Sequence, residues 1–352
     1  MTTTATASRP ATHDSLSGGR LPRWAPTTVG AIAIAGALGL NAMTGVAGWF
    51  GTSIVGAVIF IVIQSTWSFA IEGRRHAVDR LATTFVYSTF VLALVPLISV
   101  LFTVLVKGLR VMSWEFLTTS MRNVSPRNPG GGAGHAIVGT LEQVALAAAF
   151  AIPIGILAAI FLVEYGRGRL SRAISFFVDV MTGIPSIVAG LFIFTAFVLG
   201  LGLERSGFAA ALALAILMLP VIIRTTEEML RIVPNDLREA SYALGVPKWR
   251  TVIKVVLPTS LAGIVTGAML AVARVAGETA PLLLTTFLTQ SYNNNPFEGP
   301  QAALPTFVWD QITSGTPASV DRAWAGALVL IAMVMIFYIA AKLLAARFAP
   351  KG

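Results

Sequence analysis

The sequence predicts an all-α membrane protein that crosses the bilayer about eight times, with both termini on the cytoplasmic side (N-in/C-in). Hydrophobic residues make up 55% of the 352 residues and charged residues only 12%, against roughly 25% charged residues in an average soluble domain. The mean hydropathy is +0.78. The apolar residues gather in long runs with short basic clusters between them, which is typical of a multi-pass membrane protein.

Eight apolar runs approach the roughly 20 residues that a helix needs to cross the hydrocarbon core. They cover about 27–50, 52–71, 82–106, 137–163, 174–203, 207–223, 259–287 and 323–346. The first run is rich in Gly and Ala and carries Asn41 near its middle, so a re-entrant helix is the alternative there. Gly183 and Pro185 predict a kink within the fifth run.

The positions of Lys and Arg predict the sidedness. With both termini inside, 18 of the 25 basic residues fall in cytoplasmic segments and six in exterior ones, while Arg274 lies within a run. Because basic residues concentrate in cytoplasmic loops, this distribution favours the N-in/C-in arrangement. The exterior loops, 107–136 and 288–322, are rich in Gly, Pro and Asn. They are long enough to receive a partner on the outer face, and ordinary solvated loops are the alternative.

Several classes of function are excluded by composition. The chain has no cysteine, and His13, His76 and His135 are too scattered for a metal site. The net charge of +9 comes from clusters between apolar runs, which sets topology and indicates no nucleic-acid partner. No Gly-x-x-x-x-Gly-Lys-Ser/Thr motif occurs, so this chain has no phosphate-binding loop for ATP.

A polar loop at residues 224–257 separates the sixth and seventh runs. Asp236 is expected to cap a short helix that begins at Leu237, Gly245 suits the left-handed position after it, and Pro247 prevents its continuation. The loop is therefore predicted to form a helix, a tight turn and a second helix from Lys248. A purely local role, completion of a capping box with Asp236, is the alternative for Glu239.

The spacing of residues in this loop carries a family resemblance. The pattern consists of Glu239, Ala240, Ser241, Gly245, Val255, Leu257 and Pro258. It resembles the EAA signature of ABC importer permeases, with Ser241 in place of the second Ala and Val255 in place of Ile. In that family the first short helix docks in a groove of the ATP-binding subunit, so the resemblance implies that these residues couple the membrane domain to a separate ATPase.

A second group of motifs narrows the cargo. It comprises Ala273-Arg274-Val275-Ala276-Gly277-Glu278-Thr279-Ala280-Pro281-Leu282-Leu283, Trp114-Glu115-Phe116-Leu117, Gly139-Thr140-Leu141 and Glu164-Tyr165. Together these motifs resemble the phosphate-specific transport permeases of PstA type, over about residues 80 to 347. The resemblance implies a six-helix type I ABC importer core in a bacterial plasma (inner) membrane. The domain layout is then a tail (1–26), an extra transmembrane hairpin (27–79), the permease domain (80–347) and a short tail (348–352).

Arg274 and Glu278 are the predicted substrate-path residues. Four residues apart on a helix, they share one face and can pair. A charge near the bilayer centre costs roughly 2.5 to 3.5 kcal/mol on insertion scales, so such residues face a cavity or one another. A guanidinium matches an oxyanion and stays charged when buried. Thr279 and Pro281 are expected to loosen the next turn. Arg224 matches a second basic position of the resembling family, which implies that it lines the inner mouth. The alternative for the pair is a role in helix packing, and the alternative for Arg224 is an interfacial anchor.

The resemblance also implies the rest of the assembly. The chain itself is expected to be non-catalytic and to bind no cofactor, with ATP and Mg held by two partner ATP-binding subunits. A second, similar permease, an extracytoplasmic phosphate-binding protein and membrane lipid complete the expected partners.

Two other functions stay open on the sequence alone. Sulfate or molybdate permeases share the coupling signature, and only the stretch 277–281 argues against them. A secondary ion-coupled transporter would use Arg274 and Glu278 as a proton relay; it predicts related halves, and no clear internal repeat is present.

Overall fold

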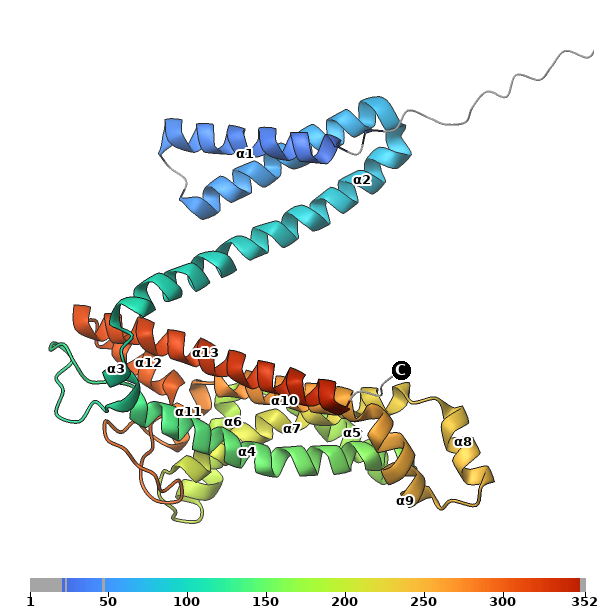
Figure 1. Ribbon diagram of the computed structural model, residues 1–352, viewed down its shortest axis with the longest axis vertical. Helices are drawn as coiled ribbons and strands as arrows, with labels where there is room; N and C mark the ends of the chain where they lie inside the picture. The colour runs from blue at the N-terminus through green and yellow to red at the C-terminus, as the bar shows by residue number, and fades with distance from the viewer. Residues whose placement is uncertain (1–20, 23, 46–47, 349–352) are drawn as a thin grey trace, which may run out of the picture. The chain divides into compact units, whose positions relative to one another are not determined.

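A computed structural model describes residues 21–22, 24–45 and 48–348, and every regular element in these ranges is helical (Figure 1). Most of the predicted cytoplasmic tails, 1–26 and 348–352, lies outside them. By internal packing the chain separates into two units that meet between Thr103 and Val104. The predicted division at residue 80 assigns the third apolar run to the permease domain and stays a prediction.

The first unit is built from α1 (Ala25–Thr44) and the part of α2 (Trp49–Val111) that ends at Thr103. At Gly73 the backbone of α2 leaves helical geometry, with φ 79° and ψ 171°. Figure 1 shows α2 changing direction along its course, with α1 lying beside its first part. A positive φ is accessible to Gly because it lacks Cβ. The single long helix is therefore two apolar segments joined at a glycine.

The second unit contains the remaining helices. They are α3 (Trp114–Thr118), α4 (Gly134–Ile160) with its π-helical end η1 (Phe161–Tyr165), α5 (Arg169–Thr182), α6 (Ser186–Ile193), η2 (Phe194–Leu199), α7 (Gly207–Ile232), α8 (Asn235–Ala243), α9 (Lys248–Thr251), η3 (Val252–Val256), α10 (Leu257–Ala276), α11 (Ala280–Thr285), α12 (Leu304–Thr313) and α13 (Pro317–Phe348). Its core lies where α4, α7 and α10 meet, and small residues such as Ala151, Ala211 and Ala271 let these helices approach closely.

Six helices in the described part of the chain are long and apolar enough to cross a membrane, or seven if the bent pair α5 and α6 counts as one span. The expected eight requires α2 to be counted as two spans. Its 63 residues hold both runs, 52–71 and 82–106, on either side of Gly73. The expected count of eight and the N-in/C-in orientation stay predictions.

Three apolar runs end at places the hydropathy did not indicate. The run predicted at 174–203 is broken at residues 183–185, where the chain bends by 110° between α5 and α6 with η2. The run predicted at 259–287 ends at Ala276, before α11 begins at Ala280. The run predicted at 207–223 continues as α7 to Ile232, since Arg224 to Arg231 are compatible with a helix and the chain turns only before Pro234.

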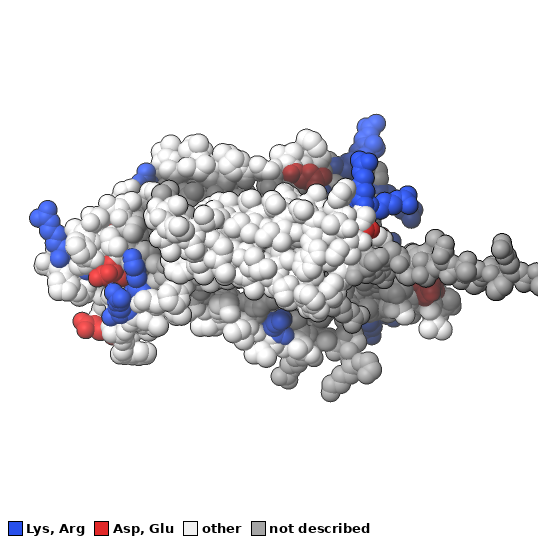
Figure 2. All heavy atoms as spheres, turned by 90° about the horizontal axis from the view of Figure 1, so that it is seen from above, with Lys and Arg blue, Asp and Glu red and all other residues white. Residues whose placement is uncertain are grey.

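The polar segments of the second unit lie at its two ends. In Figure 1, α8 and α9 project from one end, and α3 and α12 lie at the other. The predicted coupling loop and the predicted exterior loops are thus on opposite ends of the bundle. In Figure 2, α1 and α2 of the first unit lie nearest the viewer, and the face that they present is uncharged over most of its middle. This is the distribution that a bilayer requires.

Candidate functional site

The turn in the predicted coupling loop has the expected backbone, and the helix before it begins at a different residue from the one expected. Gly245 has φ +76°. Its N–H donates to the carbonyl of Tyr242 at 2.9 Å, and the N–H of Val246 donates to the carbonyl of Ser241 at 3.2 Å, which closes α8 with a Schellman motif. The helix begins at Asn235 after Pro234, with no side-chain cap, so the expected capping by Asp236 is wrong. Proline already fixes the φ of the capping position, and Asp236 lies within the first turn.

The two short helices of the loop are joined by a buried hydroxyl pair. The Oγ of Ser241 and the Oγ1 of Thr251 lie 2.8 Å apart, and both residues are buried. After Pro247 the chain forms α9, η3 and α10 without interruption, with Leu257 opening α10 and Pro258 in its first turn. The hydroxyl pair therefore links α8 to the segment that leads directly into a membrane helix.

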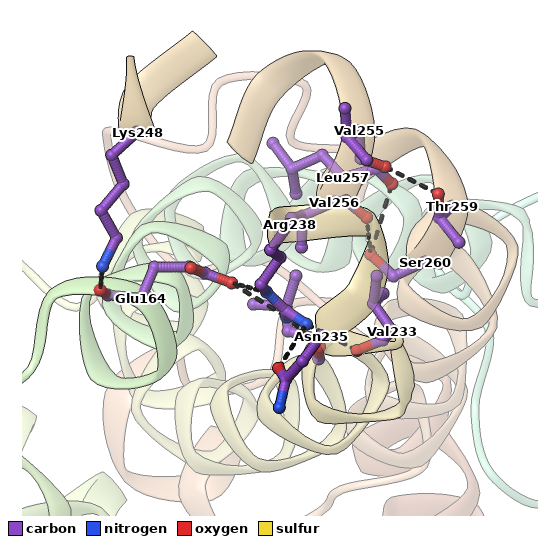
Figure 3. Close-up of polar contacts among 11 residues, drawn as sticks. Glu164, Val233, Asn235, Arg238, Lys248, Val255, Val256, Leu257, Thr259 and Ser260 are labelled. Carbon is purple, nitrogen blue, oxygen red and sulfur yellow. Dashed lines mark hydrogen bonds and ion pairs between the residues drawn. The ribbon is translucent and has the colours of Figure 1, made fainter. Parts of the chain in front are cut away.

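A buried ion pair ties α8 to the membrane bundle. Nη2 of Arg238 lies 3.0 Å from Oε1 of Glu164 at the end of α4, whose side chain is 4% exposed. The same guanidinium donates to the carbonyls of Leu230 at 2.8 Å and Val233 at 2.5 Å, and Lys248 donates to the Glu164 carbonyl. Figure 3 shows these side chains converging between the loop and the bundle.

Sequence reasoning missed this contact. Glu164 entered only as part of a motif of the resembling family, and Arg238 only as a positive charge. The available signal was the carboxylate at the end of an apolar run, but the nearest basic residues in the sequence are Arg167 and Arg169, so local spacing did not indicate Arg238.

Large apolar side chains are exposed on the loop beside charged ones. Glu239 and Ala240 are exposed on α8. Around them Leu244, which is 83% exposed, Trp249 and Tyr242 present large apolar side chains at the polar end of the bundle. Exposed apolar patches rimmed by polar residues mark protein contact sites. This surface, defined by Glu239, Ala240, Tyr242, Leu244 and Trp249, is called the loop surface below.

The structure does not form the predicted Arg274 to Glu278 pair. Because α10 ends at Ala276, Glu278 lies beyond the helix and the four-residue spacing no longer places both side chains on one face. No ion pair joins them among those found in the described residues. Arg274 is exposed in the last turn of α10, and Thr279 immediately precedes α11.

The two broken helices pack against each other. A Cβ placed on Gly190 of α6 would lie 2.5 Å from Cα of Pro281 in α11, so only glycine allows this approach. Both helices follow a break, at 183–185 and at 277–279. Non-helical backbone at membrane depth is tolerated where it is buried in protein or lines a water-filled cavity. The predicted kink at Gly183 and Pro185 is thus a full break, and a second break follows Arg274.

Arg224 is held by two carboxylates. Its Nη1 donates to Oε2 of Glu227 at 2.7 Å, its Nη2 pairs with Asp179 of α5, and the Ser175 carbonyl accepts a third bond at 3.3 Å. Glu227 also pairs with Arg231 at 2.5 Å. The sequence placed Arg224 at the inner mouth but indicated neither partner. Its donors serve a link between α5 and α7.

The chain is similar in sequence to known transport proteins. Residues 151–351 match the family described as "Binding-protein-dependent transport system inner membrane component". The phosphate transport system permease protein PstA 1 of Mycobacterium tuberculosis is 47% identical over 272 residues, covering 77% of this chain and 90% of that protein. The chain belongs to the PstA family of ABC importer permeases.

A second curated relative and a solved structure agree with this family assignment. The PstA protein of Yersinia pestis is 39% identical and covers 78% of this chain and 92% of its own length. The fold is similar to that in a crystal structure of a bacterial alginate ABC transporter in complex with a periplasmic protein, with a TM-score of 0.56 at 15% identity over 78% of this chain and 96% of that one. The type I ABC importer fold, the multi-pass inner-membrane location and the non-catalytic role expected from the sequence are confirmed.

Proposed function

We propose that this chain is the permease subunit of an ATP-driven importer of inorganic phosphate. The observation that carries the proposal is the 47% identity to a phosphate permease along nine-tenths of that protein's length. The chain provides the membrane path and catalyses no reaction. ATP is bound with Mg and hydrolysed in separate ATP-binding subunits, and phosphate is delivered by an extracytoplasmic binding protein. No nucleic acid takes part.

We further propose that the loop surface docks on an ATP-binding subunit. Its apolar side chains lie at the polar end of the bundle and surround the Glu239, Ala240 and Ser241 stretch. Movement of α8 would reach α4 and α7 through Arg238, since its guanidinium binds Glu164 and the Leu230 carbonyl together. Gly245, Leu257 and Pro258 keep the geometry of this connection.

The proposed substrate path passes Arg274. In the isolated chain this residue is exposed on α10, which carries no other charged residue. Because an uncompensated charge facing lipid is costly, we place a second, similar permease against this face, with Arg274 in the path between the two. The guanidinium would hold phosphate by paired hydrogen bonds, and Glu278 in the adjacent break would weaken that hold enough for release. Thr279 and Arg224 would shape the path from the second break and from the inner end of α7.

Uptake of radiolabelled phosphate into proteoliposomes that contain the assembled complex tests the path. Wild type should take up phosphate only with ATP, and excess sulfate or molybdate should not compete. Arg274→Ala should abolish uptake, and Arg274→Lys should reduce it, since lysine keeps the charge without the planar fork. Arg110→Ala, which removes an exposed arginine from the end of α2, should have no effect.

The same assay separates the alternatives. Uptake of sulfate or molybdate in place of phosphate would replace the cargo and leave the ABC permease function intact. Uptake that ignores ATP and follows a proton gradient would favour a secondary transporter. Full uptake by Arg274→Ala would remove Arg274 from the path.

Co-purification with the ATP-binding subunit tests the docking. Trp249→Asp and Leu244→Asp should each abolish recovery of that subunit, because an unpaired charge would be buried in an apolar contact. Trp309→Asp is the matched control, since Trp309 is also exposed but lies on α12 at the opposite end of the bundle. Equal recovery with Trp249→Asp and Trp309→Asp would rule out docking through the loop surface.

A further inference from the structure

The first unit contains two adjoining cavities that the transport function does not use. One lies between α1 and the two segments of α2 and has a volume of about 480 Å³. The other lies at the turn of α2 around Gly73 and has a volume of about 630 Å³. Pro26, Phe60 and Tyr87 line both cavities, so the two cavities lie side by side. Each volume falls in the range of roughly 300 to 1,000 Å³ that small-molecule sites occupy.

The first cavity is an apolar groove created by small residues. Ala33 and Ala37 of α1 face Gly56 and Ala57 of α2 across it, and Val91 closes its side. A Cβ on Gly56 would lie 3.4 Å from Cβ of Ala37, so the helices are in contact there. Small residues bring the helices together but leave the space beside the contact unfilled by side chains. An apolar chain fits such a groove.

The second cavity is polar and contains an unsatisfied buried amide. Gln64 is 1% exposed, lines the cavity and has no hydrogen-bond partner for Oε1. Buried side-chain oxygens in native proteins nearly always have a partner, so this one calls for a donor that the chain does not supply. Glu72 does not need one, because it accepts from the Leu21 N–H at 2.8 Å, from Ser68 at 2.6 Å and from Arg80 at 2.7 Å.

The charges on the polar cavity define the missing partner. Asp79 lines it as an exposed carboxylate with no ion-pair partner among those found in the described residues. His76 and the partly exposed Arg80 face the same space. Asp79 and Gln64 therefore favour a positively charged donor. Arg80 pairs with Glu72 through Nη2, and a guanidinium has further N–H groups that can donate to a second anion.

A ligand for the whole space must join an apolar chain to a headgroup that carries both charges. The polar cavity lies at the turn of α2 between two apolar runs, the level at which a bilayer changes from hydrocarbon to headgroups. We propose that the first unit binds one phospholipid with an ethanolamine headgroup. An acyl chain lies in the apolar groove, the ammonium donates to Gln64 Oε1 beside Asp79, and the phosphate lies toward Arg80.

Native mass spectrometry of the assembled complex tests this site, after extraction from nanodiscs of equal phosphatidylethanolamine and phosphatidylglycerol. Wild type should retain one phosphatidylethanolamine per chain. Ala57→Phe fills the groove and should lower that retention at least about tenfold, which corresponds to about 1.4 kcal/mol. Val58→Phe adds the same ring at the next residue, which is exposed and does not line the groove, and should retain the lipid.

Gln64→Leu provides an independent readout. It should lower phosphatidylethanolamine retention while leaving the lipid-free protein at least as resistant to thermal unfolding, since an unsatisfied buried oxygen is removed. The site would be overturned by three results: no retained lipid, equal retention by Ala57→Phe and Val58→Phe, or equal retention of both lipids. Phosphate uptake does not enter this test, so its outcome is separate from that of the proposed function.

Discussion

Replacement of Arg238 by methionine should detach α8 from the bundle. The substitution leaves the Glu164 carboxylate, 4% exposed, without its ion-pair partner, while methionine fills part of the volume. Removal of one partner from a buried pair costs about 3 to 5 kcal/mol because the remaining charge is uncompensated. If this cost weakens the packing of α8 on the bundle, the free energy needed to open α8 locally drops by at least about 3 kcal/mol. Amide exchange in α8 then accelerates by at least roughly 100-fold.

Hydrogen exchange of the α8 amides in the purified chain measures this effect directly. The double variant Glu164→Leu/Arg238→Met should recover much of the lost protection, since an apolar pair of similar volume often replaces a buried ion pair without cost. Arg231→Met is the matched control. Its side chain is 67% exposed, and its partner Glu227 also pairs with Arg224, so its removal leaves no uncompensated buried charge.

The reasoning would be refuted by strictly additive effects of the two substitutions. Additivity means that Glu164 and Arg238 do not interact energetically, whatever their distance. An effect of Arg231→Met as large as that of Arg238→Met would equally show that burial is not what strengthens the contact.

Three further substitutions follow from the packing. Gly190→Ala should destabilise the chain to thermal unfolding by about 1 to 3 kcal/mol, since the added Cβ meets the α11 backbone. Gly183→Ala should be tolerated, because the nearest atom lies 3.6 Å from the added Cβ. Equal unfolding temperatures of the two variants would contradict the close approach. Gly245→Ala should cost about 1 to 2 kcal/mol because of its φ of +76°, seen as faster exchange in α8; unchanged exchange would show that the turn adapts. Arg322→Met should lower the unfolding temperature, because the carbonyls of Pro126, Asn128 and Gly130 lose their donors, with a loss of stability of about 1 to 3 kcal/mol. An unaltered unfolding temperature would mean that water replaces the guanidinium.

The features that the sequence determined are local ones. The apolar runs identify the membrane class because hydropathy is additive along a helix. Gly245 and Pro247 fix the turn after α8, since a positive φ and a missing N–H are properties of single residues. The spacing from Glu239 to Pro258 identified the permease family, which the relatives confirm.

The tertiary structure decided the contacts between distant segments. Glu164 and Arg238 are 74 residues apart, and Asp179 and Arg224 are 45 apart. No local period relates such residues, and their partners are set only when the helices pack. The same cause explains the wrong pairing of Arg274 with Glu278. A four-residue spacing predicts a pair only in an unbroken helix, and α10 ends between these two residues. The following helix, α11, packs against Gly190 of α6.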